Sequence, residues 1–104
     1  MAGLKEIETM LRDGKIDKAY DSLNDYLKKD PGCAHAWYLL GGIYRRQQLW
    51  GDAINAYNKA KLIEPDGPAD AAIESIYDII RFVNTDLMNP WSRAFLTTFL
   101  PENL

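Results

Sequence analysis

Apolar residues recur along the chain at intervals of three and four positions, the spacing that places side chains on one face of an α-helix. Proline and glycine divide the chain into segments, and each segment has this helical period rather than the alternation of a strand. The pattern therefore predicts an all-α fold. We expect helices at 4–12, 16–29, 34–47, 51–63 and 68–84, and a short sixth helix at 90–100.

Several residues repeat at a distance of 34 positions. Pro65 follows Pro31 by 34, and Ala53 follows Ala19 by 34. A fixed period of this length is typical of a helical solenoid, in which each repeat packs on the next. The repeat is best developed in the middle of the chain. There the motif residues are Trp37, Leu40, Gly41, Tyr44, Ala53, Tyr57, Ala60 and Pro65.

This run resembles the signature of the tetratricopeptide repeat (TPR) family at all eight positions. The resemblance implies TPR-like helical hairpins in a fragment of a right-handed α-solenoid, and a protein-binding module without catalytic activity. We expect a single domain over 1–104. It would contain a degenerate first repeat (1–33), a well-matched repeat (34–67), a capping helix (68–86) and an apolar tail (87–104). Gln48 stands where the family usually has a turn glycine.

Two adjacent glycines lie within one predicted helix, where each costs about 1 kcal/mol relative to alanine. Gly41 shares a face with Trp37, so we expect it to let a neighbouring helix approach closely, together with the small residues Ala53 and Ala60. Loss of Trp37 is expected to cost about 3 to 5 kcal/mol. Gly42 lies about 100° further round the helix and leaves that face.

By resemblance, the face that carries Gly42 looks into the concave groove where TPR proteins bind peptides or helices. In this sequence the groove residues would be His35, Tyr38, Gly42, Arg45 and Arg46, joined from the first repeat by Leu4, Glu8 and Leu11. Gly42 is either a tolerated surface glycine or the floor of a small pocket. The lysine and asparagine that clamp a terminal carboxylate in some TPR proteins are missing. The two arginines remain candidates for acidic partner groups, or for the chain's own Glu74 and Asp78.

The C-terminal tail is too apolar to remain in water. Trp91, Phe95 and Phe99 recur four residues apart, so we expect them on one buried face of the sixth helix. Two destinations are open. The tail packs on its own repeat unit, where it covers the fifth helix or lies in the groove, or it packs on a second copy, and the chain is then a structural self-association unit that forms a homodimer.

Composition and charge argue against several classes of function. The chain has 104 residues, 47% of them hydrophobic, and a net charge of −3. We expect no nucleic-acid binding, because no basic run exceeds two residues. The chain has one cysteine and one histidine, Cys33 and His35. We therefore expect no disulfide framework, no metal or other cofactor, and no enzymatic activity. We also expect no membrane segment and a cytoplasmic protein with a protein partner, whose identity the sequence does not name.

Overall fold

The computed structural model describes residues 3–87, and their side chains through residue 82. The described residues form helices and no strand, which confirms the all-α fold. The helices are α1 (Leu4–Arg12), α2 (Ile16–Lys29), α3 (Ala34–Arg46), α4 (Trp50–Ile63) and α5 (Ala69–Leu87). These bounds lie within three residues of those predicted. The expected sixth helix, with Trp91, Phe95 and Phe99, lies outside the described residues.

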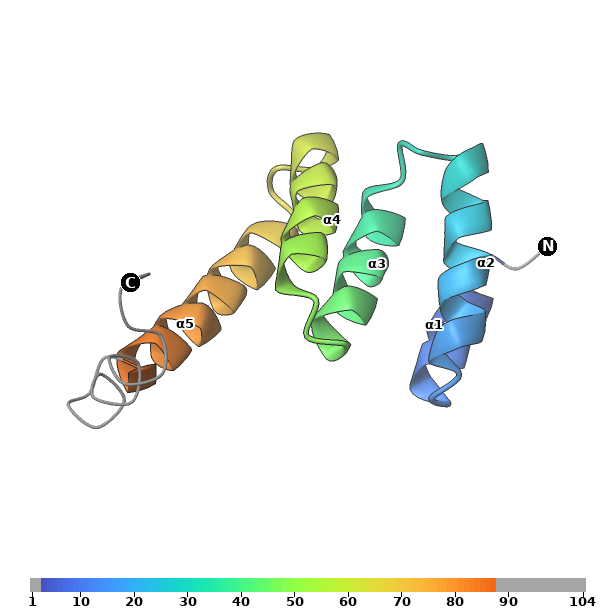
Figure 1. The fold of residues 1–104 in the computed structure, drawn as a ribbon. Helices are drawn as coiled ribbons and strands as arrows, with labels where there is room; N and C mark the ends of the chain where they lie inside the picture. The colour runs from blue at the N-terminus through green and yellow to red at the C-terminus, as the bar shows by residue number, and fades with distance from the viewer. Residues whose placement is uncertain (1–2, 88–104) are drawn as a thin grey trace. The chain divides into compact units, whose positions relative to one another are not determined.

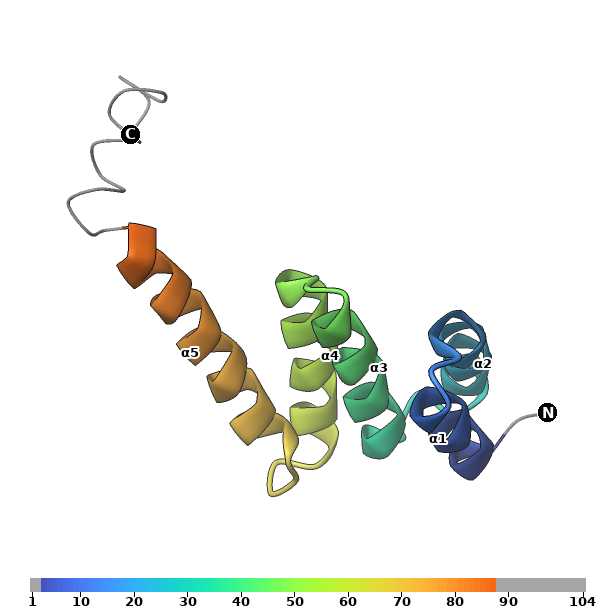
Figure 2. The ribbon, with the colours of Figure 1, turned by 90° about the horizontal axis from the view of Figure 1, so that it is seen from below.

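The chain divides into two compact units, Met1–Ile73 and Glu74–Leu104. The first contains two antiparallel helical hairpins, α1–α2 and α3–α4, whose helices lie side by side in both ribbon views (Figures 1 and 2), and the start of α5. In the second unit, the described part of α5 carries exposed aromatic side chains at Tyr77 and Phe82.

The main core of the first unit lies where α1, α2 and α3 meet. Ile7, Leu23 and Ile43 are each at most 1% exposed, because the apolar stripe of each amphipathic helix faces the same interior. A hydrophobic helix face of this kind supplies most of a helix's stability in a protein. The full cluster of buried residues is Ile7, Ala19, Leu23, Leu27, Ala36, Leu40, Ile43 and Ala56.

Small residues set the close packing of α3 against α4. A Cβ atom added to Gly41 would lie 2.6 Å from two carbons of the Tyr57 ring, closer than real Cβ atoms come. On the α4 side Ala53 and Ala60 are both buried. The ring of Tyr57 therefore occupies the space that a side chain at position 41 would need. In this packing Gly41 is required for its size.

Trp37 joins α3 to the connection that precedes it. Its indole Nε1 donates a hydrogen bond of 2.8 Å to the backbone carbonyl of Pro31. On the α4 side, the Lys59 ammonium lies 4.6 Å from the centroid of the ring, within the range of a cation–π contact. One side chain therefore links the end of the first hairpin to both helices of the second.

The same turn follows α1 and α3, at positions 34 residues apart. After α1, the N–H of Lys15 bonds to the carbonyl of Met10, and Gly14 has a φ of +81°. After α3, the N–H of Leu49 bonds to the carbonyl of Tyr44, and Gln48 has a φ of +61°. Both turns have the Schellman hydrogen-bond pattern. The residue with the left-handed backbone conformation is a glycine in the first repeat and a glutamine in the second.

Changing Gln48→Gly is expected to stabilise the protein, because glycine adopts a left-handed conformation without the steric cost of about 1 to 2 kcal/mol that other residues incur. Part of this gain is offset by the greater freedom of glycine in the unfolded chain. We expect a net gain of about 1 kcal/mol and a higher melting temperature. Gly14→Gln, the reciprocal change at the equivalent turn, should lower it. Equal melting temperatures for all three proteins would show that the left-handed turn carries no cost.

Tyr44, one of the eight motif residues, pairs with a tyrosine of the first repeat. Its ring meets that of Tyr20 edge-on, with the centroids 5.9 Å apart, and the two hydroxyls are within 3.2 Å. The hydrogen bond with Tyr20, followed by burial, raises the pKa of Tyr44 to about 12. This pair connects α2 to α3.

Alkaline pH is therefore expected to weaken the fold through Tyr44. As the pH rises above about 10, tyrosine in the unfolded chain loses its proton before the folded Tyr44 does. The unfolded state then binds fewer protons, so stability falls between about pH 10 and 12. Tyr44→Phe removes this contribution, and Tyr20→Phe removes its main cause. Urea unfolding across this range should show a shallower decline for both variants, and a decline parallel to the wild type would contradict the assignment.

Candidate functional site

The face predicted as a groove is formed within the first unit by α1 and α3. His35 on α3 contacts Glu8 on α1, with 2.7 Å between Nε2 and Oε1. These side chains are 51% and 37% exposed. Eleven residues further along α3, Arg46 Nη1 lies 3.5 Å from the backbone carbonyl of Leu11, to which it donates a hydrogen bond. Polar contacts at both ends of α3 thus join the two helices along this face.

Between these contacts lies an open hollow of about 200 Å³, here called the groove hollow. A Cβ atom on Gly42 would meet only the hydroxyl of Tyr57, at 3.9 Å, so the glycine leaves this part of the surface bare. The ring of Tyr38 lies 5.4 Å from that of Tyr57, centroid to centroid. The lining residues are Leu11, Tyr38, Leu39, Gly42, Ile43, Arg46 and Tyr57.

Tyr57 is the buried base of this hollow. It is 3% exposed. Burial raises the pKa of Tyr57, and Tyr38 adds a smaller contribution in the same direction, whereas Arg45 lowers this pKa. A tyrosine in such surroundings stays protonated and offers a neutral hydroxyl. The groove hollow therefore combines aromatic walls with a guanidinium group at Arg46, a mixture suited to a side chain with an apolar body or an acidic end.

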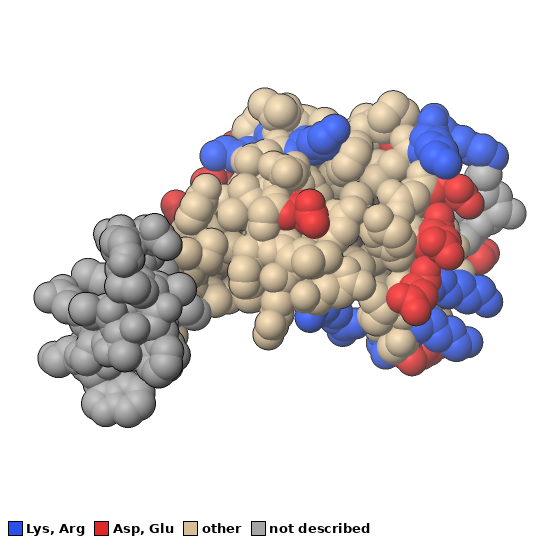
Figure 3. Space-filling view, in the orientation of Figure 1, with Lys and Arg blue, Asp and Glu red and all other residues tan. Residues whose placement is uncertain are grey.

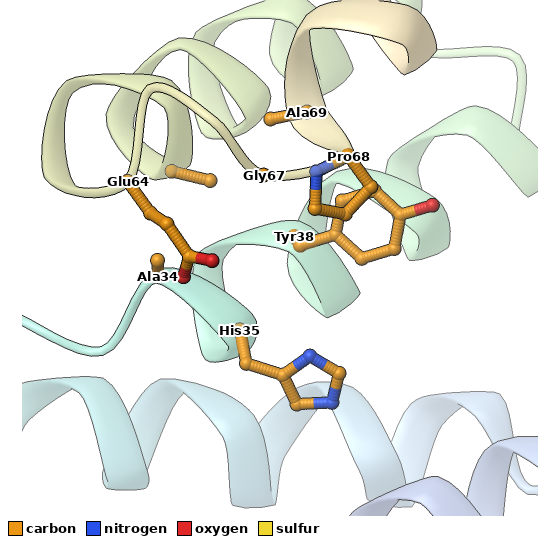
Figure 4. A pocket seen from close by; sticks show the side chains of 8 residues that line it. Ala34, His35, Tyr38, Glu64, Gly67, Pro68 and Ala69 are labelled. Carbon is orange, nitrogen blue, oxygen red and sulfur yellow. The ribbon is translucent and has the colours of Figure 1, made fainter.

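A second cavity, of about 100 Å³, lies where the connection after α4 passes the start of α3. We call it the turn pocket (Figure 4). Tyr38 lines both this pocket and the groove hollow. The turn pocket has walls of small residues, and its ionisable members are Glu64, His35 and Tyr38. Its full lining is Ala34, His35, Tyr38, Ala60, Glu64, Gly67, Pro68 and Ala69.

A family model described as tetratricopeptide repeat matches residues 4–74. The chain belongs to the tetratricopeptide repeat family. Among solved structures, it is similar to a Bacteroides fragilis protein determined by solution NMR, at 30% sequence identity and a TM-score of 0.73. That alignment covers 100% of this chain and 99% of the other. No curated protein matches this sequence.

TPR repeats are generally protein-interaction modules and are generally non-catalytic. Within the residues that the structure describes, no group of three or more histidine, cysteine or acidic side chains is arranged to hold a metal ion. None of the described helices is long and apolar enough to cross a membrane. Charged side chains gather over the α1–α2 hairpin on the face shown in Figure 3, whereas the surface over α3 and α4 is largely uncharged.

The structure brings together only part of the predicted TPR groove. Five predicted residues line one or both cavities: Leu11, His35, Tyr38, Gly42 and Arg46. Glu8 is connected to them through its contact with His35. Leu4 packs against the core cluster, and Arg45 lowers the pKa of Tyr57. Of the acids considered as partners for the arginines, Asp78 pairs with Arg81 on its own helix.

Sequence reasoning missed the residues that α4 and its following turn contribute. Glu64 and Gly67 lie outside the eight motif positions that distinguish the repeat, so the motif gave no reason to single them out. One signal was available. Pro68 follows Ala34 by 34 residues, which places the start of the next repeat beside the start of α3 in a stacked solenoid.

Proposed function

We propose that this TPR protein is a non-catalytic module that binds a peptide or helical segment of another protein on the face formed by α1 and α3. The observation that carries the proposal is the groove hollow, where a bare glycine lies between the Tyr38 ring and Arg46. Such a site suits recognition, because one partner side chain can enter it while the neighbouring groups fix its orientation.

The chemistry of the hollow favours a partner side chain of a particular kind. Aromatic side chains and arginine are the residues that most often dominate binding energy at interfaces. Tyr38 presents a half-buried ring, and Arg46 is exposed with most of its N–H groups left over after the contact with Leu11. We therefore expect the partner to place an acidic or small polar side chain over Gly42, where the guanidinium of Arg46 can reach it.

A random dodecapeptide library displayed on phage tests this function. Peptides selected on the immobilised protein would be synthesised with a fluorescent label and titrated by polarisation. The variant Tyr38→Ala/Arg46→Glu is expected to weaken binding at least about tenfold, because it truncates one dominant contact and reverses another. Lys28→Glu, a charge reversal at an exposed position of α2, should leave affinity unchanged.

Two results would contradict the proposal. One is a wild-type protein that selects no peptide. The other is equal affinity in the double variant and the wild type, provided that circular dichroism melts show both to be folded.

A further inference from the structure

The turn pocket differs chemically from the groove hollow beside it. In Figure 4 the Glu64 carboxylate and the Tyr38 ring lie at two sides of the pocket, with Gly67 and Pro68 along one edge and His35 along another. A Cβ on Gly67 would lie 3.4 Å from Glu64 Oε1. The glycine therefore leaves room for the carboxylate to fold back over the turn and reach the pocket.

Among the described residues, the charged neighbours of this carboxylate are engaged by other side chains. Lys61 is engaged by Asp70, with 2.9 Å between Nζ and Oδ1, and His35 is engaged by Glu8. No ion pair within the described part of the chain includes Glu64. The Glu8 carboxylate offsets a positive charge on His35, so the rim of the turn pocket is negative in either protonation state of the imidazole. A cationic group is the ligand that this charge would attract.

The size and walls of the pocket select among cations. A cavity of about 150 Å³ holds a benzene molecule, so one of about 100 Å³ suits an unbranched chain better than a ring. Its alanine walls offer contact to methylene groups, and an aromatic ring such as that of Tyr38 attracts a positive charge placed over its face. Lysine has a four-carbon stem that packs on apolar surface and a compact charge at its end, whereas the guanidinium of arginine is broad and planar.

We propose that the turn pocket receives a lysine side chain of the partner segment, with its methylene groups against the alanine walls and its ammonium at Glu64. This inference rests on the proposed function, because the lysine belongs to the segment that fills the groove hollow. Tyr38 is the wall shared by both cavities, so one segment reaches both. An acidic or small polar side chain near Arg46 and a lysine near Glu64 then fix the direction in which the segment lies along α3.

Parallel selections from the same phage library on three proteins test the lysine site. They are the wild type, Glu64→Gln, which removes the charge and keeps the shape, and Asp66→Asn, a matched change in the same turn at a residue that does not line the pocket. Peptides selected on the wild type and on Asp66→Asn should be enriched in lysine over the unselected library. Those selected on Glu64→Gln should lose this enrichment.

The selected peptides then allow a direct measurement. Replacing the enriched lysine with norleucine, which keeps the stem and removes the charge, should weaken binding to the wild type about two- to fivefold, as expected for a partly exposed ion pair. The same replacement should have no effect on Glu64→Gln. Arginine in place of lysine should also bind more weakly to the wild type.

The outcomes separate the two proposals. Peptides that bind the groove hollow with no lysine enrichment, or with the same enrichment on Glu64→Gln, would overturn the lysine site and leave the proposed function standing. A wild-type protein that selects no peptide would overturn both. Arginine that binds as well as lysine would overturn the choice of lysine.

Discussion

Gly41→Leu is expected to unfold the protein, whereas Gly42→Ala, one residue further along α3, is expected to stabilise it. The difference comes from the ring of Tyr57. It lies 2.6 Å from a Cβ placed on Gly41, while its hydroxyl lies 3.9 Å from a Cβ placed on Gly42. A leucine at position 41 would need space that a buried ring already fills, and no rotamer removes the overlap at its Cβ. The hairpin α3–α4 would have to separate.

The milder change Gly41→Ala allows the size of the effect to be measured in a folded protein. Overpacking a core costs about 1 to 3 kcal/mol, and the better helix propensity of alanine returns about 1 kcal/mol of this. We expect a net loss at position 41 and, without the overlap, a net gain of up to about 1 kcal/mol at position 42. For a domain of this size each kcal/mol shifts the melting temperature by about 4 to 8 °C.

Thermal melts of Gly41→Ala and Gly42→Ala therefore form a matched comparison. Both exchange glycine for alanine within one helix, so propensity cancels and only the surroundings differ. Melting temperatures that move in the same direction by the same amount would show that Tyr57 does not limit position 41. Gly42→Ala has a second use, since the added methyl group partly fills the groove hollow and should weaken the selected peptides without harming the fold.

The fold could be predicted from the sequence because its determinants are local and periodic. Five helices followed from the helical spacing of apolar residues and from the prolines and glycines between them, and the 34-residue period indicated how they stack. The role of Gly41 in close helix packing could be predicted because this residue lies on the same helix face as Trp37. Gly42 could be assigned to a different face for the same reason, but the presence of the Tyr57 hydroxyl beneath it depends on how far α4 lies from α3.

The candidate site could be predicted only in part, because its cavities are formed by residues from different helices. Periodicity placed Tyr38 and Arg46 on one face of α3. It did not reveal Glu64, which reaches the turn pocket through the conformation of a turn and the absence of a side chain at Gly67. The partner of Tyr44 was missed for a related reason, since Tyr20 belongs to the degenerate repeat, where the motif is weakest.

Trp37→Ala is expected to destabilise the protein by about 3 kcal/mol, the lower end of the range for removing a large aromatic side chain, because the indole is only partly buried. The packing contacts of its ring, the cation–π contact with Lys59 and the hydrogen bond to Pro31 would all be lost. Trp37→Phe separates these contributions. Phenylalanine keeps most of the aromatic contact and lacks the N–H donor, while water can satisfy the exposed carbonyl of Pro31, so we expect a cost of about 1 kcal/mol.

Urea unfolding of the wild type and both variants measures the two costs. An expected loss of about 3 kcal/mol is a large share of the roughly 5 to 15 kcal/mol that stabilises a small domain, so Trp37→Ala should unfold at a much lower urea concentration. If Trp37→Phe lost as much stability as Trp37→Ala, the hydrogen bond to Pro31 rather than the packing of the ring would hold α3 to the preceding connection. If neither variant lost stability, the most characteristic residue of the repeat would have no structural role in this protein. Its position between Pro31 and Lys59 argues against that result, because removal of the ring removes its contacts with both residues and leaves a void where a large side chain was packed.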